Sequence, residues 1–310
     1  MRNKFVRGVC KIVSFIIVFC IIFAVLQNVI PPKYYGERIN SFYNLENNSI
    51  DVLFLGGSQM FCTVDAQKLT DEYEISSYDF GASAQRLAIT YYYLQEALKY
   101  QHPKVVMVEM GAFFFESEFD EQTLAWNYVP TPLTIEKYYS LKNILGGDRL
   151  KAIKYCLPLL VYHSNWGSLW FYEEHSERIR GFLGYDTTKE VTMVQDDGEV
   201  YEPTQDTVDA LTDIVQLCGE NNIEIVFFKS PVTDWTGTQL KVVKEFMAEN
   251  HFEYLDCNDY FDEIGINLKT DFFDEHHLNV TGADKTTDLI ADYLKKLLGQ
   301  QENDDPPTAP

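Results

Sequence analysis

Five short apolar runs alternate with longer amphipathic stretches along this 310-residue chain, and this alternation constrains the fold more than any other feature. The runs are rich in β-branched and aromatic residues and are bounded by Gly, Pro, Asn or Ser, as strands are. They cover residues 51–55, 75–80, 104–110, 223–228 and 252–256. The amphipathic stretches cover residues 87–100, 204–218, 239–250 and 284–298. The pattern predicts a three-layer α/β fold, in which helices cover both faces of a mostly parallel five-stranded sheet.

One segment, residues 113–201, interrupts the alternation. It contains no convincing buried strand, but it has helical patterns at residues 150–161 and 169–180 and a turn signal around Asp196-Asp197-Gly198. We therefore expect a mostly helical insertion after the third strand, with a small hairpin at the turn. The folded domain should cover residues 49–299, and the polar, Pro-rich residues 300–310 should form a disordered tail.

The N-terminal segment predicts a membrane anchor. Residues 12–30 carry no charge, and an α-helix of that length extends about 28 Å, close to the thickness of a bilayer's hydrocarbon core. Residues 1–11 hold four cations and no acid, so the positive-inside rule keeps this basic tail cytoplasmic and exports the rest of the chain. The alternative is a cleavable signal peptide, but its apolar region would be shorter and would end in an A-x-A site. We expect a single-pass signal-anchor at the cell membrane, with residues 31–48 as a linker to an extracytoplasmic domain.

Charge and composition exclude several classes of function. Lys and Arg total 25 against 47 Asp and Glu, a net charge of −22, which repels phosphate backbones and argues against a nucleic-acid partner. Apolar residues make up 46% of the chain and aromatic residues 15%, which excludes a disordered protein. The six cysteines have no metal-finger spacing and indicate no disulfide framework. One bond between two of the four outside the N-terminal segment stays open; these are Cys62, Cys156, Cys218 and Cys257.

Ser58 is the first candidate for chemistry. It follows the first predicted strand and the pair Gly56-Gly57, so a tight turn can present its hydroxyl where parallel sheets bind their ligands. Its own N–H can point at a developing oxyanion. The plainer interpretation is that Ser58 caps the next helix.

Asp274 and His277 are the second candidate, in the loop after the last predicted strand. An Asp three residues before a His can orient the imidazole through one nitrogen and leave the other free to take a proton from a serine. In a doubly wound sheet this loop and the Ser58 turn can open on the same edge. One alternative is a solvated acidic loop; another is a metal site that uses Asp271, Asp274, His276 or His277. We expect no metal.

These segments resemble the conserved blocks of the SGNH/GDSL-type serine esterases and acyltransferases. Residues 51–58 (DVLFLGGS) are similar to the family's first block, residues 78–81 (YDFG) to its second and residues 274–279 (DEHHLN) to its last. The resemblance covers about residues 50–298 and is greatest to membrane-anchored members related to the D-alanyl-transfer protein DltD. It implies a flavodoxin-like SGNH fold.

The resemblance also implies a site and an activity. Ser58, His277 and Asp274 would form a Ser-His-Asp triad, and the backbone N–H groups of Ser58 and Gly81 would form the oxyanion hole. The implied function is that of an exported esterase or O-acyltransferase that acts on acyl groups of cell-envelope polysaccharides or related polymers. Such a protein needs no cofactor, and an integral membrane acyltransferase is its expected partner.

The chain departs from this family at the third block. The family supplies an Asn side chain to the oxyanion hole in a G-x-N-D context, whereas this chain has Glu109-Met110-Gly111-Ala112. Loss of one donor costs several kcal/mol of transition-state stabilisation, and a negative Glu109 would add to that loss. Gln85 is a candidate for the missing donor, although a helix-start residue is its plainer interpretation. The alternative function is therefore a catalytically weak or inactive SGNH-like partner of an envelope-polymer acylation machine.

Four residues are candidates for substrate binding. Arg86 could hold an anionic substrate group, although a surface ion pair is its plainer role. Trp166 could stack on a sugar face, but its helical spacing to Trp170 is more typical of a core. His163 could reach the site from the insertion, and Glu109 lies where the third strand ends.

Overall fold

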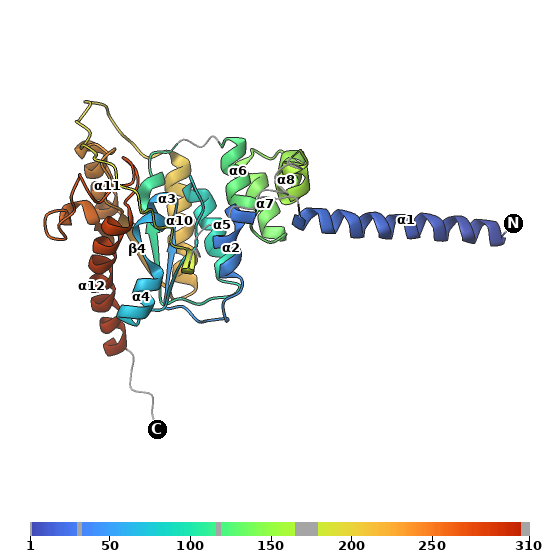
Figure 1. The fold of residues 1–310 in the computed structure, drawn as a ribbon, viewed down its shortest axis with the longest axis horizontal. Helices are drawn as coiled ribbons and strands as arrows, with labels where there is room; N and C mark the ends of the chain where they lie inside the picture. Colours follow the sequence, from blue (N-terminus) through green and yellow to red (C-terminus); the bar gives the residue numbers. More distant parts are fainter. Residues whose placement is uncertain (1, 30–32, 116–118, 165–178, 305–310) are drawn as a thin grey trace, which may run out of the picture.

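The computed structural model describes residues 2–29, 33–115, 119–164 and 179–304. A five-stranded sheet in the order β2-β1-β3-β4-β5 forms its centre, and every strand pair in it is parallel (Figure 1). The strands are β1 (Val52–Leu55), β2 (Ser77–Asp79), β3 (Val105–Glu109), β4 (Glu224–Lys229) and β5 (Tyr254–Asp256). The predicted α/β class and all five predicted strands are confirmed.

The two faces of the sheet are each covered by helices, as predicted. Side chains of one strand alternate between the faces, so that Leu53 and Leu55 pack in one core and Val52 and Phe54 in the other. The first core is covered by α5 (Leu87–Ala97), α10 (Gln205–Glu220) and α11 (Gly237–Glu249). The second is covered by α3 (Ser58–Thr63), α4 (Ala66–Tyr73) and α12 (Val280–Asp304). The chain is therefore a three-layer sandwich.

Helix α12 begins four residues before the predicted start, at Val280. The side-chain oxygen of Asn279 accepts hydrogen bonds from the backbone N–H groups of Thr281 (3.0 Å) and Gly282 (3.2 Å), so this residue caps the first turn. The helix continues to Asp304, into the tail predicted to be disordered, and residues 305–310 lie outside the described part.

The segment predicted as a linker contains a helix of the folded domain. Helix α2 (Lys33–Phe42) buries Ile39 and Phe42 in the core that also contains α5. The ring of Phe42 stacks on that of Phe80, with the ring centroids 4.0 Å apart. The prediction of a linker over residues 31–48 was wrong, because Ile39 and Phe42 lie three residues apart on one helix face and pack in the core.

The described part of the insertion is helical, as predicted. It contains α6 (Glu121–Tyr128), α7 (Ile135–Ile144), α8 (Arg149–Cys156) and α9 (Pro158–Tyr162). The single helix expected at residues 150–161 is two helices, α8 and α9. They are separated at Pro158 because proline has no N–H to donate and clashes with the preceding turn. Most of the helix expected at residues 169–180 lies outside the described residues.

No hairpin forms around Asp196-Asp197-Gly198, contrary to the prediction. Residues 182–204 contain neither helix nor strand. The backbone N–H of Val191 donates to the carbonyl of Leu268 (2.9 Å), and that of Val194 donates to the carbonyl of Thr233 (2.8 Å). Loops from other parts of the chain therefore hold this segment. Their carbonyls accept hydrogen bonds from backbone N–H groups that would pair with the opposite strand in a hairpin.

The N-terminal helix α1 (Arg2–Val29) projects from the domain on the side of α7 and α8 (Figure 1). Its segment Phe5–Gln27 is long and apolar enough to cross a membrane, and none of it is buried in the protein. The side-chain oxygen of Gln27 accepts a hydrogen bond from the backbone N–H of Leu159 in α9 (2.7 Å). The apolar helix therefore ends against the insertion.

The six cysteines all lie in the described part of the chain, and none of them forms a disulfide. Cys62, Cys156, Cys218 and Cys257 are buried, while Cys10 and Cys20 lie exposed on α1. The four buried thiols act as small apolar side chains of the core.

The carboxyl group of Asp79, at the end of β2, is buried without a hydrogen bond to the described residues. The residue is fully buried, and neither carboxyl oxygen has a partner among them. Burial raises the pKa of Asp79 well above its usual range, although the guanidinium of Arg38 acts in the opposite direction. The neutral acid is therefore the form that this position favours.

We predict that Asp79→Asn stabilises the chain at neutral pH. Because native Asp79 keeps its proton where the unfolded chain releases it, wild-type stability falls above about pH 4, by up to about 1.4 kcal/mol per pH unit. The Asn variant, which has nearly the same shape, lacks this loss. Melting temperatures of the full chain in detergent micelles from acid to neutral pH measure the effect. Parallel curves for the two proteins would contradict it.

Candidate active site

Ser58 lies where strand β1 turns sharply into helix α3. It is the first residue of that helix, and Gly57 occupies the N-cap position without any side-chain cap. Ser58 therefore does not cap α3, which was the plainer interpretation of the sequence. Because Ser58 lies in the first turn, its backbone N–H has no carbonyl acceptor within the helix. Both its hydroxyl and its N–H lie at the carboxyl edge of the sheet, and the side chain is half-buried.

The loop after β5 folds back on itself and fixes Asp274 and His277. Phe272 and Leu278 form an isolated antiparallel bridge, and the N–H of Phe273 donates to the carbonyl of His277 (2.9 Å). One carboxylate oxygen of Asp274 accepts from the backbone N–H groups of His276 (2.8 Å) and His277 (2.9 Å). These bonds hold the carboxylate beside the imidazole.

The structure brings Ser58, His277 and Asp274 into one hydrogen-bonded chain. The Oγ of Ser58 lies 2.7 Å from Nε2 of His277, a residue 219 positions further along the sequence. Nδ1 of the same imidazole lies 2.9 and 3.1 Å from the two carboxylate oxygens of Asp274. Because a carboxylate can only accept, it fixes the proton on Nδ1 and leaves Nε2 as the acceptor for the serine hydroxyl. Such a chain can activate a hydroxyl as a nucleophile.

The residues of the rival metal site have separate partners. His276 pairs with another residue, since its Nδ1 lies 2.7 Å from a carboxylate oxygen of Asp234. Asp271 is buried, and its carboxylate accepts from Nζ of Lys285 (2.6 Å). Among the described residues, no group of three His, Cys, Asp or Glu side chains is arranged to hold a metal ion.

Gly81 lies against Gly56, two residues before Ser58, because the ends of β1 and β2 approach each other closely. A Cβ at this position would lie 2.1 Å from the carbonyl oxygen of Gly56, so only glycine fits. Its N–H makes no hydrogen bond to any described residue. Gln85 does not supply the missing side-chain donor. Its buried amide accepts from the N–H of Ala82 (2.8 Å) and donates to Thr90 (3.0 Å), and so braces the loop that carries Gly81.

Glu109 is neither a substrate-binding group nor an uncompensated charge. Its carboxylate forms a fully buried ion pair with Nζ of Lys229 (2.8 Å). It also accepts from the backbone N–H groups of Gly111 (2.6 Å) and Ser230 (3.3 Å). Lys229 was not identified from the sequence as part of the site. The available signal was a single lysine at the end of the mostly apolar strand segment EIVFFK. Its partner became evident only from the pairing of β3 with β4.

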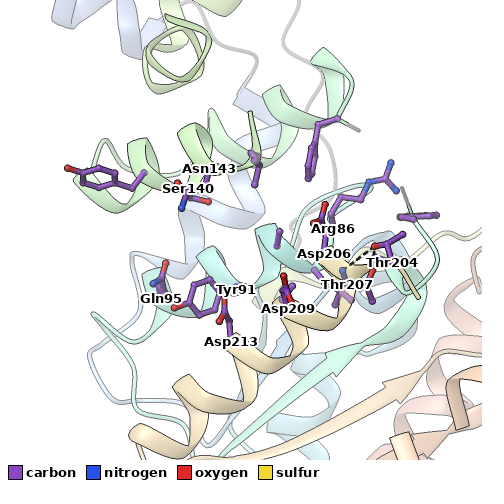
Figure 2. A pocket seen from close by; sticks show the side chains of 18 of the residues that line it. Arg86, Tyr91, Gln95, Ser140, Asn143, Thr204, Asp206, Thr207, Asp209 and Asp213 are labelled. Carbon is purple, nitrogen blue, oxygen red and sulfur yellow. Dashed lines mark hydrogen bonds between the residues drawn. The ribbon is translucent and has the colours of Figure 1, made fainter. Parts of the chain in front are cut away.

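Arg86 borders a cavity of about 990 Å³ between α5, α7 and α10, which Ser58, His277 and Asp274 do not line. Its guanidinium lies 4.0 Å above the ring of Phe115. Figure 2 shows the carboxylates of Asp206, Asp209 and Asp213 along α10 on one side of the cavity and Ser140 and Asn143 on the other. This acidic lining disfavours an anionic ligand in the cavity. The proposed contact of Arg86 with an anionic substrate group stays a prediction.

Of the other two candidates, His163 does not join the site. His163 follows α9, a helix that packs against α8 and α1, and its ring is exposed and contacts the carbonyl of Leu160 (3.2 Å). The structure does not bring it to the strand ends. Trp166 lies outside the described residues.

We predict that Gly81→Ala destabilises the chain, because the added methyl group must push apart the ends of β1 and β2. Overpacking of this kind costs about 1–3 kcal/mol. Gly219→Ala is the matched control, since a Cβ there meets no atom within 4 Å and lies inside α10, where Ala is favoured by up to about 1 kcal/mol. Thermal melting in detergent compares the two. Equal tolerance of both substitutions would contradict the close approach.

Comparisons with known proteins identify no family for this chain. No protein-family model matches it, and no curated protein sequence matches it. Among solved structures it is similar to one from Bacteroides fragilis described as "a putative acylhydrolase", with 12% sequence identity, a TM-score of 0.41 and coverage of 84% of this chain and 95% of that one.

Proposed function

We propose that this protein is a membrane-anchored, extracytoplasmic serine esterase or O-acyltransferase of the SGNH type. Its substrates would be acyl groups on cell-envelope polysaccharides or related polymers. The observation that carries the proposal is the hydrogen-bonded chain from Ser58 through His277 to Asp274. It joins two segments at opposite ends of the domain in the arrangement that nucleophilic catalysis requires.

The first half-reaction follows from these contacts. Ser58 Oγ attacks the acyl carbonyl while its proton moves to Nε2 of His277, and Asp274 stabilises the imidazolium that forms. The oxyanion of the tetrahedral intermediate accepts hydrogen bonds from the backbone N–H groups of Ser58 and Gly81. When the intermediate collapses, the alcohol leaves with the proton from Nε2, and an ester to Ser58 remains.

The second half-reaction repeats these steps with another acceptor. Water attacks the acyl-serine in an esterase, and a hydroxyl group of a glycan or related polymer attacks it in a transferase. His277 removes the proton of the acceptor and returns it to Ser58. Neither half needs a cofactor.

The apolar helix supports a location at the membrane. Segment Phe5–Gln27 has the length and composition of a membrane span, and the cations before and within its start favour a cytoplasmic N-terminus. We propose that the domain lies outside the cytoplasm, tethered close to envelope polymers, as in the DltD-related proteins that the sequence resembles. An integral membrane acyltransferase would then be its partner.

One observation favours the alternative, a weak or inactive partner of an acylation machine. Position 111 is a glycine, so the third block contributes no side-chain donor. The buried ion pair of Glu109 with Lys229 weakens this alternative, since the charge expected to oppose an oxyanion is compensated.

We predict that the full chain in detergent reacts with a fluorophosphonate probe at Ser58. Ser58→Ala should abolish labelling, because no other residue would supply the nucleophile. His277→Ala should slow labelling by about 10³-fold or more, because the serine loses its base.

His276→Ala is the matched control. It removes the neighbouring imidazole, which pairs with Asp234 rather than with Ser58, and should label at nearly the wild-type rate. A folded wild type that does not label would favour the inactive partner. Equal loss in both histidine variants would argue against the assigned base.

A further inference from the structure

The side chain of Gln59 occupies the space where a residue at position 111 would project. A Cβ on Gly111 would lie 2.3 Å from Oε1 and 3.2 Å from Cδ of Gln59. The carboxyl ends of β1 and β3 lie next to each other in the sheet, so a side chain that starts from α3, after β1, reaches over the turn that follows β3. An amide is thus present at this place although residue 111 does not supply it.

The amide of Gln59 is held in one orientation. Its Oε1 accepts from Nζ of Lys229 (2.7 Å), which can only donate. The same Nζ pairs with Glu109 (2.8 Å), so it is fixed by a buried charge. The main chain is held as well, since the hydroxyl of Ser230 donates to the carbonyl of Gln59 (3.2 Å).

This arrangement leaves the Nε2 of Gln59 as a preorganised donor. No described residue accepts a hydrogen bond from it, and the half-buried residue follows Ser58 in the first turn of α3, at the carboxyl edge of the sheet. A fixed donor next to a nucleophile stabilises developing negative charge without reorganisation.

We propose that Gln59 is a catalytic residue, whose Nε2–H donates the third hydrogen bond to the oxyanion on the acyl carbonyl, with Lys229 as its positioning residue. This inference rests on the proposed serine-esterase function. The buried Lys229–Glu109 pair then has a role in the site, because it fixes which end of the Gln59 amide faces the substrate.

The test is steady-state hydrolysis of p-nitrophenyl acetate by the full chain in detergent, with Ser58→Ala as the background rate. Gln59→Met keeps the length of the side chain and removes the donor, and Gln59→Glu keeps an acceptor for Lys229. Both should lower kcat by about 10²–10³-fold with little change in KM, because the bond forms only in the transition state. Gln67→Met is the matched control and should leave kcat unchanged, since Gln67 is a half-buried residue of α4 whose amide donates to Asp71.

Two different results would overturn the inference. If wild type is no faster than Ser58→Ala, the proposed function fails and the role of Gln59 fails with it. If wild type is active and either Gln59 variant melts at the wild-type temperature with a kcat close to wild type, only the role of Gln59 fails.

A separate observation concerns the exposed face of helices α8 and α9, which we call the α8–α9 face. It presents Leu150 (81% exposed), Ile153 (41%) and Leu160 (40%) to solvent. Arg149 and Lys151 are exposed on α8 among them, and residues 149–163 contain no acid in a chain of net charge −22. Apolar and cationic side chains together are typical of a helix face that lies in a membrane interface.

The position of this face agrees with that composition. Helix α1 ends against α9 through the bond between Gln27 and Leu159, and α8 lies beside the end of α1 (Figure 1). The α8–α9 face therefore lies next to the end of the apolar segment Phe5–Gln27. We infer that this face docks on the outer surface of the bilayer, with Leu150 and Ile153 in the interface and the cations on anionic lipid headgroups.

The test uses the full chain in vesicles of phosphatidylcholine and phosphatidylglycerol. Cys10→Ala and Cys20→Ala leave only buried thiols, and Leu150→Cys then takes an environment-sensitive fluorophore. Val200→Cys, at a position 85% exposed, is the matched control. The label at position 150 should be blue-shifted and severalfold less quenched by aqueous iodide than the label at position 200. Equal quenching at both positions would overturn the docking.

Discussion

Parallel pairing of the five strands is the constraint from which the site follows. In the order β2-β1-β3-β4-β5, all carboxyl ends lie on one edge, so the turns after the strands meet there whatever their distance in sequence. Ser58 follows β1, Gly81 follows β2, and the loop that contains Asp274 and His277 comes after β5. A hydrogen bond between residues 219 positions apart is a consequence of this geometry.

The same edge explains why a buried ion pair lies behind the site. Glu109 ends β3 and Lys229 ends β4, in strands that are neighbours, and both side chains are fully buried. Burying two charges costs solvation that their attraction only partly offsets. Here the pair also binds Gln59 and the backbone of residues 111 and 230, so it orders three turns at once. The buried ion pair therefore fixes one conformation of the turns around Ser58.

Periodicity predicted most of the fold because each element carries its own signal. The strands are short apolar runs and the helices have one apolar face, so both could be recognised locally. The misassigned parts depend on distant partners. Helix α2 is stabilised by Phe80 across the core, and residues 182–204 are bonded to carbonyls of other loops. By position alone, Gln85 was a plausible oxyanion donor and Glu109 a plausible substrate contact, yet their polar groups bond to neighbours that the sequence does not reveal.

The sequence by itself determined the α/β class, the apolar N-terminal helix, and the Ser58 and Asp274–His277 segments as candidates for chemistry. These depend on residue type and on spacing over a few positions, which local physics fixes. The tertiary structure decided which nitrogen of which histidine lies beside Ser58, that Lys229 compensates Glu109, and that Gln59 lies over Gly111. Those features depend on the approach of strand ends that are adjacent only after the sheet has formed, and no local pattern encodes such a distance.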